Sequence, residues 1–270
     1  MTTFYAWVVP AYFTGSPVDH TWVTSYDNRA HPYADIAAVK KAGQSNWYCW
    51  GDFHASGGAS GHPDGFVGSR NGAGPVATCL VQPNRSCDDS PAARGTIFKY
   101  GLDGVCHQLA NQVLSATGTK GKAPLTVKGV RGYAVSTFLY GTYGLQQAAW
   151  QSKLENCAGI KPLRRMPPTA EERMEEFPDD FEENARAALS DKPELLARLM
   201  ALRSDVTAYA ARRIPGFYPP DAAFLNARNQ HLLDQAAALL GPEDFYKVFG
   251  VEPGERVDVV DPTIMGSERD

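Results

Sequence analysis

The side chains best suited to chemistry are confined to the first part of this 270-residue chain, and this uneven distribution constrains its fold most strongly. All five cysteines, all five tryptophans and five of the six histidines lie within residues 1–160. That part holds 12 basic against 9 acidic residues, whereas residues 161–270 hold 14 against 21. Residues 161–169, where the balance changes, are basic and rich in proline, which is typical of a linker. We therefore predict a domain over residues 1–160 and a helical accessory region over residues 161–270.

The two parts also differ in their hydrophobic patterns, which together predict an α+β fold. Alternating, aromatic-rich segments in the first part predict short strands over residues 4–13, 20–26, 46–53, 77–81, 125–130 and 133–140. Apolar residues at helical spacing predict helices over residues 104–114, 144–156, 191–206, 221–240 and 242–249. The glycine-rich stretch over residues 55–75 is predicted to be a loop, either a functional lid or plain surface.

Charge and hydropathy exclude two classes of partner. A net charge of −4, with no basic stripe, predicts no nucleic-acid partner. No apolar run approaches the roughly 20 residues that span a bilayer, so we expect no membrane span. The N-terminal residues lack the pattern of a secretory leader, which predicts a cytoplasmic location with reduced cysteines; export by a route that needs no such leader is the alternative. Cys79 and Cys87 are close enough in sequence to form a disulfide in an oxidising compartment, and the sequence leaves this open.

Cys106 is the cysteine whose position best suits a nucleophile. Val105, Leu109 and Val113 recur at helical spacing, and Asp103 has the side chain of a helix N-cap, so Cys106 is expected in a first turn. There, the helix dipole and unpaired backbone N–H groups stabilise a thiolate and a developing oxyanion. The alternative is a buried core thiol, because the rest of the helix is largely apolar.

A nucleophilic thiol needs a base within hydrogen-bond reach. His107 follows Cys106 directly, but adjacent helical positions diverge by about 100° around the axis, which aims its side chain elsewhere. We prefer His20, in a predicted strand where it shares a face with Trp22 and Tyr26. Its alternative role is that of a hydrogen-bonded histidine in the sheet.

The order of these residues resembles a known group of enzymes. His20 precedes Cys106, and Val105-Cys106-His107-Gln108-Leu109 places the cysteine at the start of a helix. This layout resembles the circularly permuted papain-like, NlpC/P60-related group, which includes lecithin-retinol acyltransferase-like proteins. The resemblance covers about residues 5–140, does not include the group's exact cysteine motifs, and finds no counterpart for residues 161–270. It implies a papain-like antiparallel sheet or barrel with a cysteine-bearing helix.

The resemblance also implies an acyl-transfer activity that needs no cofactor or metal. Cys106 would attack an amide, peptide, ester or thioester carbonyl, with His20 as the base. With water as the acceptor, the enzyme is a hydrolase such as an amidase or thiol protease; with an amine or alcohol, it is an acyltransferase. A third residue would orient the imidazole. Asp52 is the preferred residue for this role, and Asn46 and His54 are the alternatives.

Two other function classes remain open. A metal-dependent hydrolase would use ligands from the first part, although no close ligand pair occurs among them; the residues are His20, His31, His54, His62, Cys79 and Cys87. A binding protein without catalysis would use an aromatic stacking surface; its tryptophans would be Trp7, Trp22, Trp47 and Trp50. The expected ligand is a peptide or small molecule, and the leucine stripe over residues 195–202 packs internally or forms a dimer or partner interface.

Overall fold

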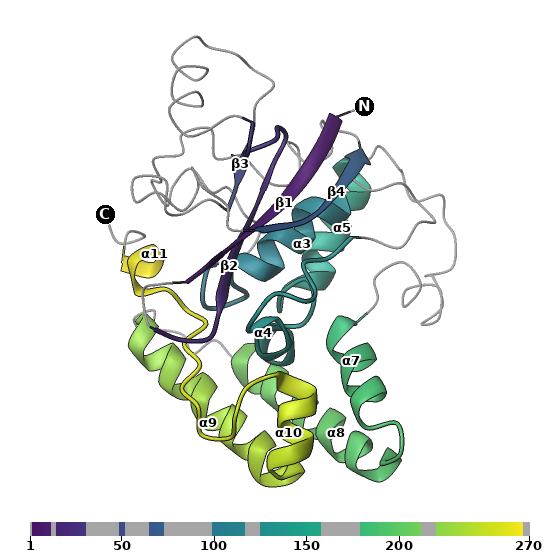
Figure 1. Ribbon diagram of the computed structural model, residues 1–270, viewed down its shortest axis with the longest axis vertical. Helices are drawn as coiled ribbons and strands as arrows, with labels where there is room; N and C mark the ends of the chain where they lie inside the picture. Colours follow the sequence, from purple (N-terminus) through teal and green to yellow (C-terminus); the bar gives the residue numbers. More distant parts are fainter. Residues whose placement is uncertain are drawn as a thin grey trace.

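The computed structural model describes most of the chain and shows a mixed α+β fold (Figure 1). The described residues are 2–11, 15–30, 49–51, 65–72, 99–116, 125–157, 179–211 and 220–266. In these ranges, a four-stranded sheet is combined with helices that lie on one face of it and beyond one end.

The sheet is antiparallel and has the strand order β3-β2-β1-β4. Its strands are β1 (Thr2–Pro10), β2 (Asp19–Thr24), β3 (Cys49–Trp50) and β4 (Gly65–Gly72). The register places Ala6 opposite Val23 and Trp7 opposite Trp22. Successive side chains of a strand point to opposite faces, so Ala6 and Val23 face one side and both tryptophans face the other. Strand β4 corrects the sequence prediction, because residues 65–72 were expected to be part of a loop.

Helix α3 (Cys106–Ala116) covers one face of the sheet. Phe4, Ala6 and Val23 from the strands pack against Leu109 and Val113 from the helix in one hydrophobic cluster. The helix predicted over residues 104–114 is therefore confirmed, with its start two residues later. Helix α5 (Gln147–Cys157) confirms the helix predicted over residues 144–156.

Helix α4 (Tyr133–Tyr140) occupies a segment where the sequence predicted a strand. Seven of its eight residues are buried, so the segment has no polar face to reveal a helical period. Its valine, threonine, tyrosine and phenylalanine residues favour strands when considered one at a time. The segment predicted as a strand over residues 125–130 contains no strand either. The strand predicted over residues 77–81 lies outside the described residues.

The described helices of the second part are α7 (Asp180–Ala188), α8 (Pro193–Ala211), α9 (Ala222–Leu240), α10 (Pro242–Phe249) and α11 (Pro262–Gly266). Among them, α7, α8 and α10 pack on α4, while α9 packs on α8 and α10, and α11 packs on α9 (Figure 1). The predicted helices over residues 221–240 and 242–249 are confirmed, and α8 confirms the one over 191–206. None of the helices in the described ranges has the length and hydropathy to cross a membrane.

The two predicted parts contribute to one hydrophobic cluster. Val105, Phe138 and Leu139 pack in the same cluster as Phe181 and Leu225. Residues 161–169 lie outside the described residues, so the predicted boundary there stays a prediction. Because the cluster crosses that boundary, the helices of the second part complete a core that the first part begins.

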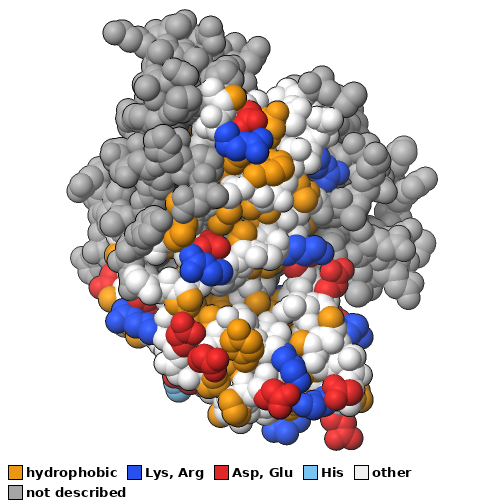
Figure 2. Space-filling model, in the orientation of Figure 1, with side chains coloured by type: hydrophobic (Ala, Val, Ile, Leu, Met, Phe, Trp, Pro, Cys, Tyr) orange, Lys and Arg blue, Asp and Glu red, His pale blue; other side chains and the backbone are white. Residues whose placement is uncertain are grey.

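Charged side chains are mixed on the surface of the helical part. On the face shown in Figure 2, basic and acidic side chains lie next to each other over the lower helices. Several form pairs, such as Lys192 with Asp244 at 2.7 Å and Arg186 with Glu182 within α7. This face therefore presents no continuous patch of one sign.

Candidate functional site

Cys106 is the first residue of α3, and so lies in the first turn, where the sequence placed it. The helix start is capped by Gln108, whose side-chain Oε1 accepts a hydrogen bond from the Val105 backbone N–H at 3.0 Å. A glutamine at the third helical position commonly reaches back to the N-cap in this way. The predicted cap, Asp103, has another role: its carboxylate accepts the Lys99 backbone N–H at 3.0 Å. The prediction of Asp103 as N-cap is therefore wrong.

The Cys106 thiol is buried, with 5% of the residue exposed. Burial raises the pKa of this thiol to about 11, although the nearby Thr21 backbone and side chain and the His107 backbone lower it. The nearby charge of Asp261 raises the pKa further. The sequence led us to expect a stabilised thiolate, and the structure corrects this: loss of solvent raises the thiol pKa more than the nearby polar groups lower it, so the resting thiol is neutral.

His20 lies in β2, where the sequence placed it, and is buried. Its ring stacks on Trp22 with the ring centres 5.9 Å apart. Thr21, the next residue along β2, interacts with Cys106. Because strand side chains alternate, the His20 ring and the Thr21 side chain leave β2 on opposite faces. The structure thus brings the Cys106 sulfur to the backbone beside His20, with the His20 ring directed to the other side of the strand.

His107 is fully buried and is held by two hydrogen bonds. Its Nε2 lies 2.9 Å from the Asp19 backbone oxygen, and its Nδ1 lies 2.8 Å from Ser136 Oγ. A carbonyl oxygen only accepts, so Nε2 carries the proton and neutral Nδ1 accepts from the serine hydroxyl. Burial lowers the pKa of His107 to about 4. His107 therefore joins α3 to β2 and α4 as a neutral brace, and it is not aimed at Cys106.

Asp19, at the start of β2, forms a second connection beside this brace. Its carboxylate accepts from the Arg131 side chain at 2.8 and 2.9 Å and from the Arg131 backbone N–H at 2.9 Å. Arg131 lies just before α4 and is exposed on its outer side. The strand that carries His20 is thus fixed at its first residue to the start of α4.

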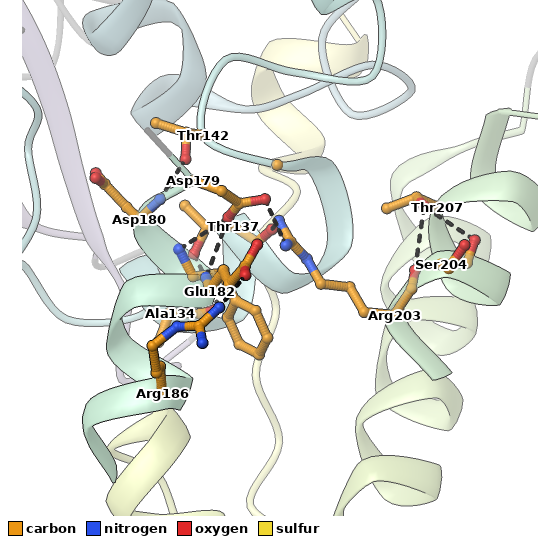
Figure 3. Close-up of polar contacts among 12 residues, drawn as sticks. Ala134, Thr137, Thr142, Asp179, Asp180, Glu182, Arg186, Arg203, Ser204 and Thr207 are labelled. Atoms are coloured by element: carbon orange, nitrogen blue, oxygen red, sulfur yellow. Dashed lines mark hydrogen bonds and ion pairs between the residues drawn. The ribbon is translucent and has the colours of Figure 1, made fainter. Parts of the chain in front are cut away.

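A chain of buried polar groups continues from α3 into the helical part. Asn111 donates to Tyr133 Oη at 2.8 Å, and the tyrosine hydroxyl donates to Asp180 Oδ2 at 2.5 Å. The Asp180 backbone N–H in turn donates to Thr142 Oγ1 at 2.9 Å (Figure 3). Burial and the Asp180 charge raise the pKa of Tyr133 well above its usual value, so its hydroxyl remains protonated and can donate.

Arg203 closes the junction between α4, α7 and α8, as Figure 3 shows. From α8 it donates to Asp179 Oδ2 at 2.6 Å and to the Thr137 backbone oxygen at 3.0 Å. Its guanidinium carbon lies 4.8 Å from the centre of the Phe181 ring. Asp179 also caps α7 by accepting the Phe181 and Glu182 backbone N–H groups. One buried arginine therefore ties the end of one helix to the beginning of another.

The other predicted site residues are only partly covered. The three candidates for orienting the imidazole, Asp52, Asn46 and His54, lie outside the described residues. So do His31, His62, Cys79, Cys87 and Trp47. Within the described ranges, no three potential ligand side chains form a cluster suited to a metal ion.

The tryptophans within the described ranges do not form an open stacking surface. Trp7, Trp22 and Trp50 are each no more than 1% exposed. Phe66 is 44% exposed and, together with Trp7, lies beneath the Arg29 guanidinium. The aromatic residues of the sheet thus serve mainly as core.

Sequence reasoning missed Thr21, Asp19 and Ser136. Ser136 meets His107 across 29 positions of sequence, and Asp19 meets it across 88. Partners so distant in sequence follow no helical or strand period that could reveal them. One local signal was present for Asp19, since it stands next to the predicted base His20.

In comparisons with known proteins, no protein-family model, no curated protein and no solved structure matches this chain.

Proposed function

We propose that the protein is a cysteine-dependent hydrolase or acyltransferase that acts on an amide, peptide or ester bond. Cys106 is the nucleophile and His20 is the base. Asp52 is proposed to orient the imidazole, with Asn46 and His54 as the alternatives. The ligand is a peptide or a small molecule, and no cofactor takes part.

One observation carries this proposal: Cys106 is the first residue of α3, and backbone groups of Thr21 and His107 lie close to its sulfur. The Thr21 hydroxyl is also close to the sulfur but has no hydrogen-bond partner among the described residues. Donors at a helix start favour the negative charge that develops on sulfur and on an attacked carbonyl oxygen. His20 is the neighbour of Thr21 along β2, but its ring leaves the strand on the opposite face, so the ring must turn toward Cys106 before it can act as the base.

A neutral resting thiol sets the order of the chemical steps. The Cys106 S–H proton passes to His20 as the sulfur attacks the carbonyl carbon and a C–S bond forms. The bond from the carbonyl carbon to the leaving nitrogen or oxygen then breaks, and His20 returns the proton to that atom. Water, an amine or an alcohol next attacks the thioester carbonyl and gives its proton to His20; the C–S bond then breaks, and His20 returns the proton to the Cys106 sulfur.

The test is acylation of the full chain by p-nitrophenyl acetate, followed by mapping of the acetyl group to each cysteine peptide. We expect acetyl transfer to Cys106, and its loss together with p-nitrophenol release in Cys106→Ala. Cys49→Ala is the matched control, because Cys49 is also buried but lies in β3. His20→Gln should lower the acylation rate by roughly a hundredfold or more, the usual contribution of a general base.

Two outcomes would contradict the proposal. Acetylation that persists at full rate in Cys106→Ala would remove the nucleophile. A His20→Gln variant with an unchanged rate and an unchanged pH profile would remove the base, and would direct attention to the non-catalytic binding function.

A further inference from the structure

The segment of residues 251–266, here called the strap, runs from α10 back toward the sheet (Figure 1). Its first eleven residues belong to no helix or strand, and α11 follows. Side chains from elsewhere hold its backbone. Ser16 Oγ accepts the Asp258 N–H at 2.9 Å, and Gln230 Oε1 accepts the Val257 N–H at 3.0 Å. Asn226 bonds both to the N–H and to the carbonyl oxygen of Val260, at 3.0 and 2.9 Å.

The strap packs directly on the loop that leads into Cys106. The Asp261 backbone N–H donates to Tyr100 Oη at 3.2 Å. A Cβ atom added at Gly101 would lie 2.8 Å from Val260 Cγ1 and 2.9 Å from Met265 Sδ. Strap and loop are therefore so close that only a glycine fits at position 101.

The strap also contributes to the surroundings of the thiol itself. Val105, the residue before Cys106, shares a hydrophobic cluster with Val257 and Val259 of the strap. Asp261 is 1% exposed, and its charge acts on Cys106. The strap thus contributes apolar side chains to the cluster that contains Val105, and its Asp261 is buried near enough for its charge to affect the thiol.

We propose that the strap is an internal cover, so that Cys106 reacts only while residues 251–266 are lifted from the loop over residues 99–105. This regulation rests on the proposed function of the same thiol. Opening breaks the strap's backbone hydrogen bonds and also exposes the buried side chains of Val257, Val259 and Val260, so it is a rare local unfolding event. The cover shields the thiol from side reactions and admits an acyl donor during the open phase.

The test measures the rate at which iodoacetamide alkylates Cys106 in the folded full chain, by mass spectrometry of its peptide. Ser16→Ala and Gln230→Ala each remove hydrogen bonding to the strap and leave the thiol's own contacts in place. Each should raise the rate by about tenfold, which corresponds to about 1.4 kcal/mol. Asn184→Ala is the matched control: it removes a bond of the same kind, to the Val248 backbone oxygen at 2.7 Å, outside the strap. It should change the rate less than about twofold.

Unchanged alkylation in both strap variants would overturn the proposal, and so would an equal increase in Asn184→Ala. Alkylation requires no turnover, so failure of the cover and failure of the proposed function are distinguishable. Faster alkylation in the strap variants without any acylation by p-nitrophenyl acetate rejects the enzyme and keeps the cover. Acylation at Cys106, combined with an alkylation rate that the strap variants do not change, keeps the enzyme and rejects the cover.

Discussion

His107 lies wholly inside the protein with both ring nitrogens engaged, one by Ser136 and the other by the Asp19 main chain. An imidazole in this position cannot accept a further proton without losing the hydrogen bond from Ser136. It is therefore a structural group, although it stands next to the proposed nucleophile in sequence. His20 and His107 thus illustrate that residue type and sequence position alone do not assign a role.

The low pKa of His107 predicts a loss of stability in mild acid. In the unfolded chain this group titrates near 6.5, whereas burial lowers its folded pKa to about 4. As the pH falls from about 6.5 to about 4, His107 becomes protonated in the unfolded chain but stays neutral in the folded protein. The free energy of unfolding therefore falls by about 3 kcal/mol. His107→Gln lacks this titration and should show a shallower decline between pH 7 and pH 4 in urea unfolding. Equal declines in both proteins would contradict the assignment.

Among the elements, predictability follows how evenly each one is buried. Helices α9 and α10 have both a buried and an exposed side and begin or end at Gly241, so pattern and turn chemistry agree. Helix α4 is buried nearly all round, and its predicted strand was wrong. The start of α3 was found because apolar spacing marks it, whereas Thr21 reaches Cys106 only through the tertiary packing of β2 against α3.

The junction of α4, α7 and α8 predicts a large difference between two arginines. Arg203 has a side chain only 6% exposed and pairs with Asp179, whereas Arg186 is 65% exposed and pairs with Glu182. Arg203→Met should lower the free energy of unfolding by roughly 2 kcal/mol, because it leaves the buried Thr137 carbonyl oxygen unsatisfied and the half-exposed Asp179 unpaired. Arg186→Ala should cost less than about 0.5 kcal/mol, as exposed pairs do. Urea unfolding of both variants measures this, and similar losses would contradict the buried role of Arg203.

On the scale of the whole molecule, one hydrophobic cluster joins the two predicted parts, so the stability of each part depends on the other. Phe138 of α4 packs edge-on against Phe249 of α10, with ring centres 5.2 Å apart, and also contacts Phe181 of α7. The chain was expected to consist of a domain and an accessory region. The sequence shows where the composition changes. It does not show that the two parts share one core, because contacts between distant segments follow no helical or strand period.

A fragment of residues 1–160 should therefore fail to fold by itself. It would expose Phe138, Leu139 and Val105, which the second part covers. We expect aggregation or a broad, non-cooperative thermal transition, while the full chain unfolds in one step. Circular dichroism and size-exclusion chromatography of both proteins provide the measurement. A soluble, cooperatively folding fragment would show that the first part is stable without the shared cluster.

The segregation of tryptophans gives the molecule two separate optical reporters. Trp7, Trp22, Trp50 and Trp150 are buried in and around the sheet, and residues 161–270 contain no tryptophan. The fluorescence of these four tryptophans therefore senses the sheet side, while far-ultraviolet ellipticity is dominated by the helices. Any event that loosens one side before the other will separate the two signals in time.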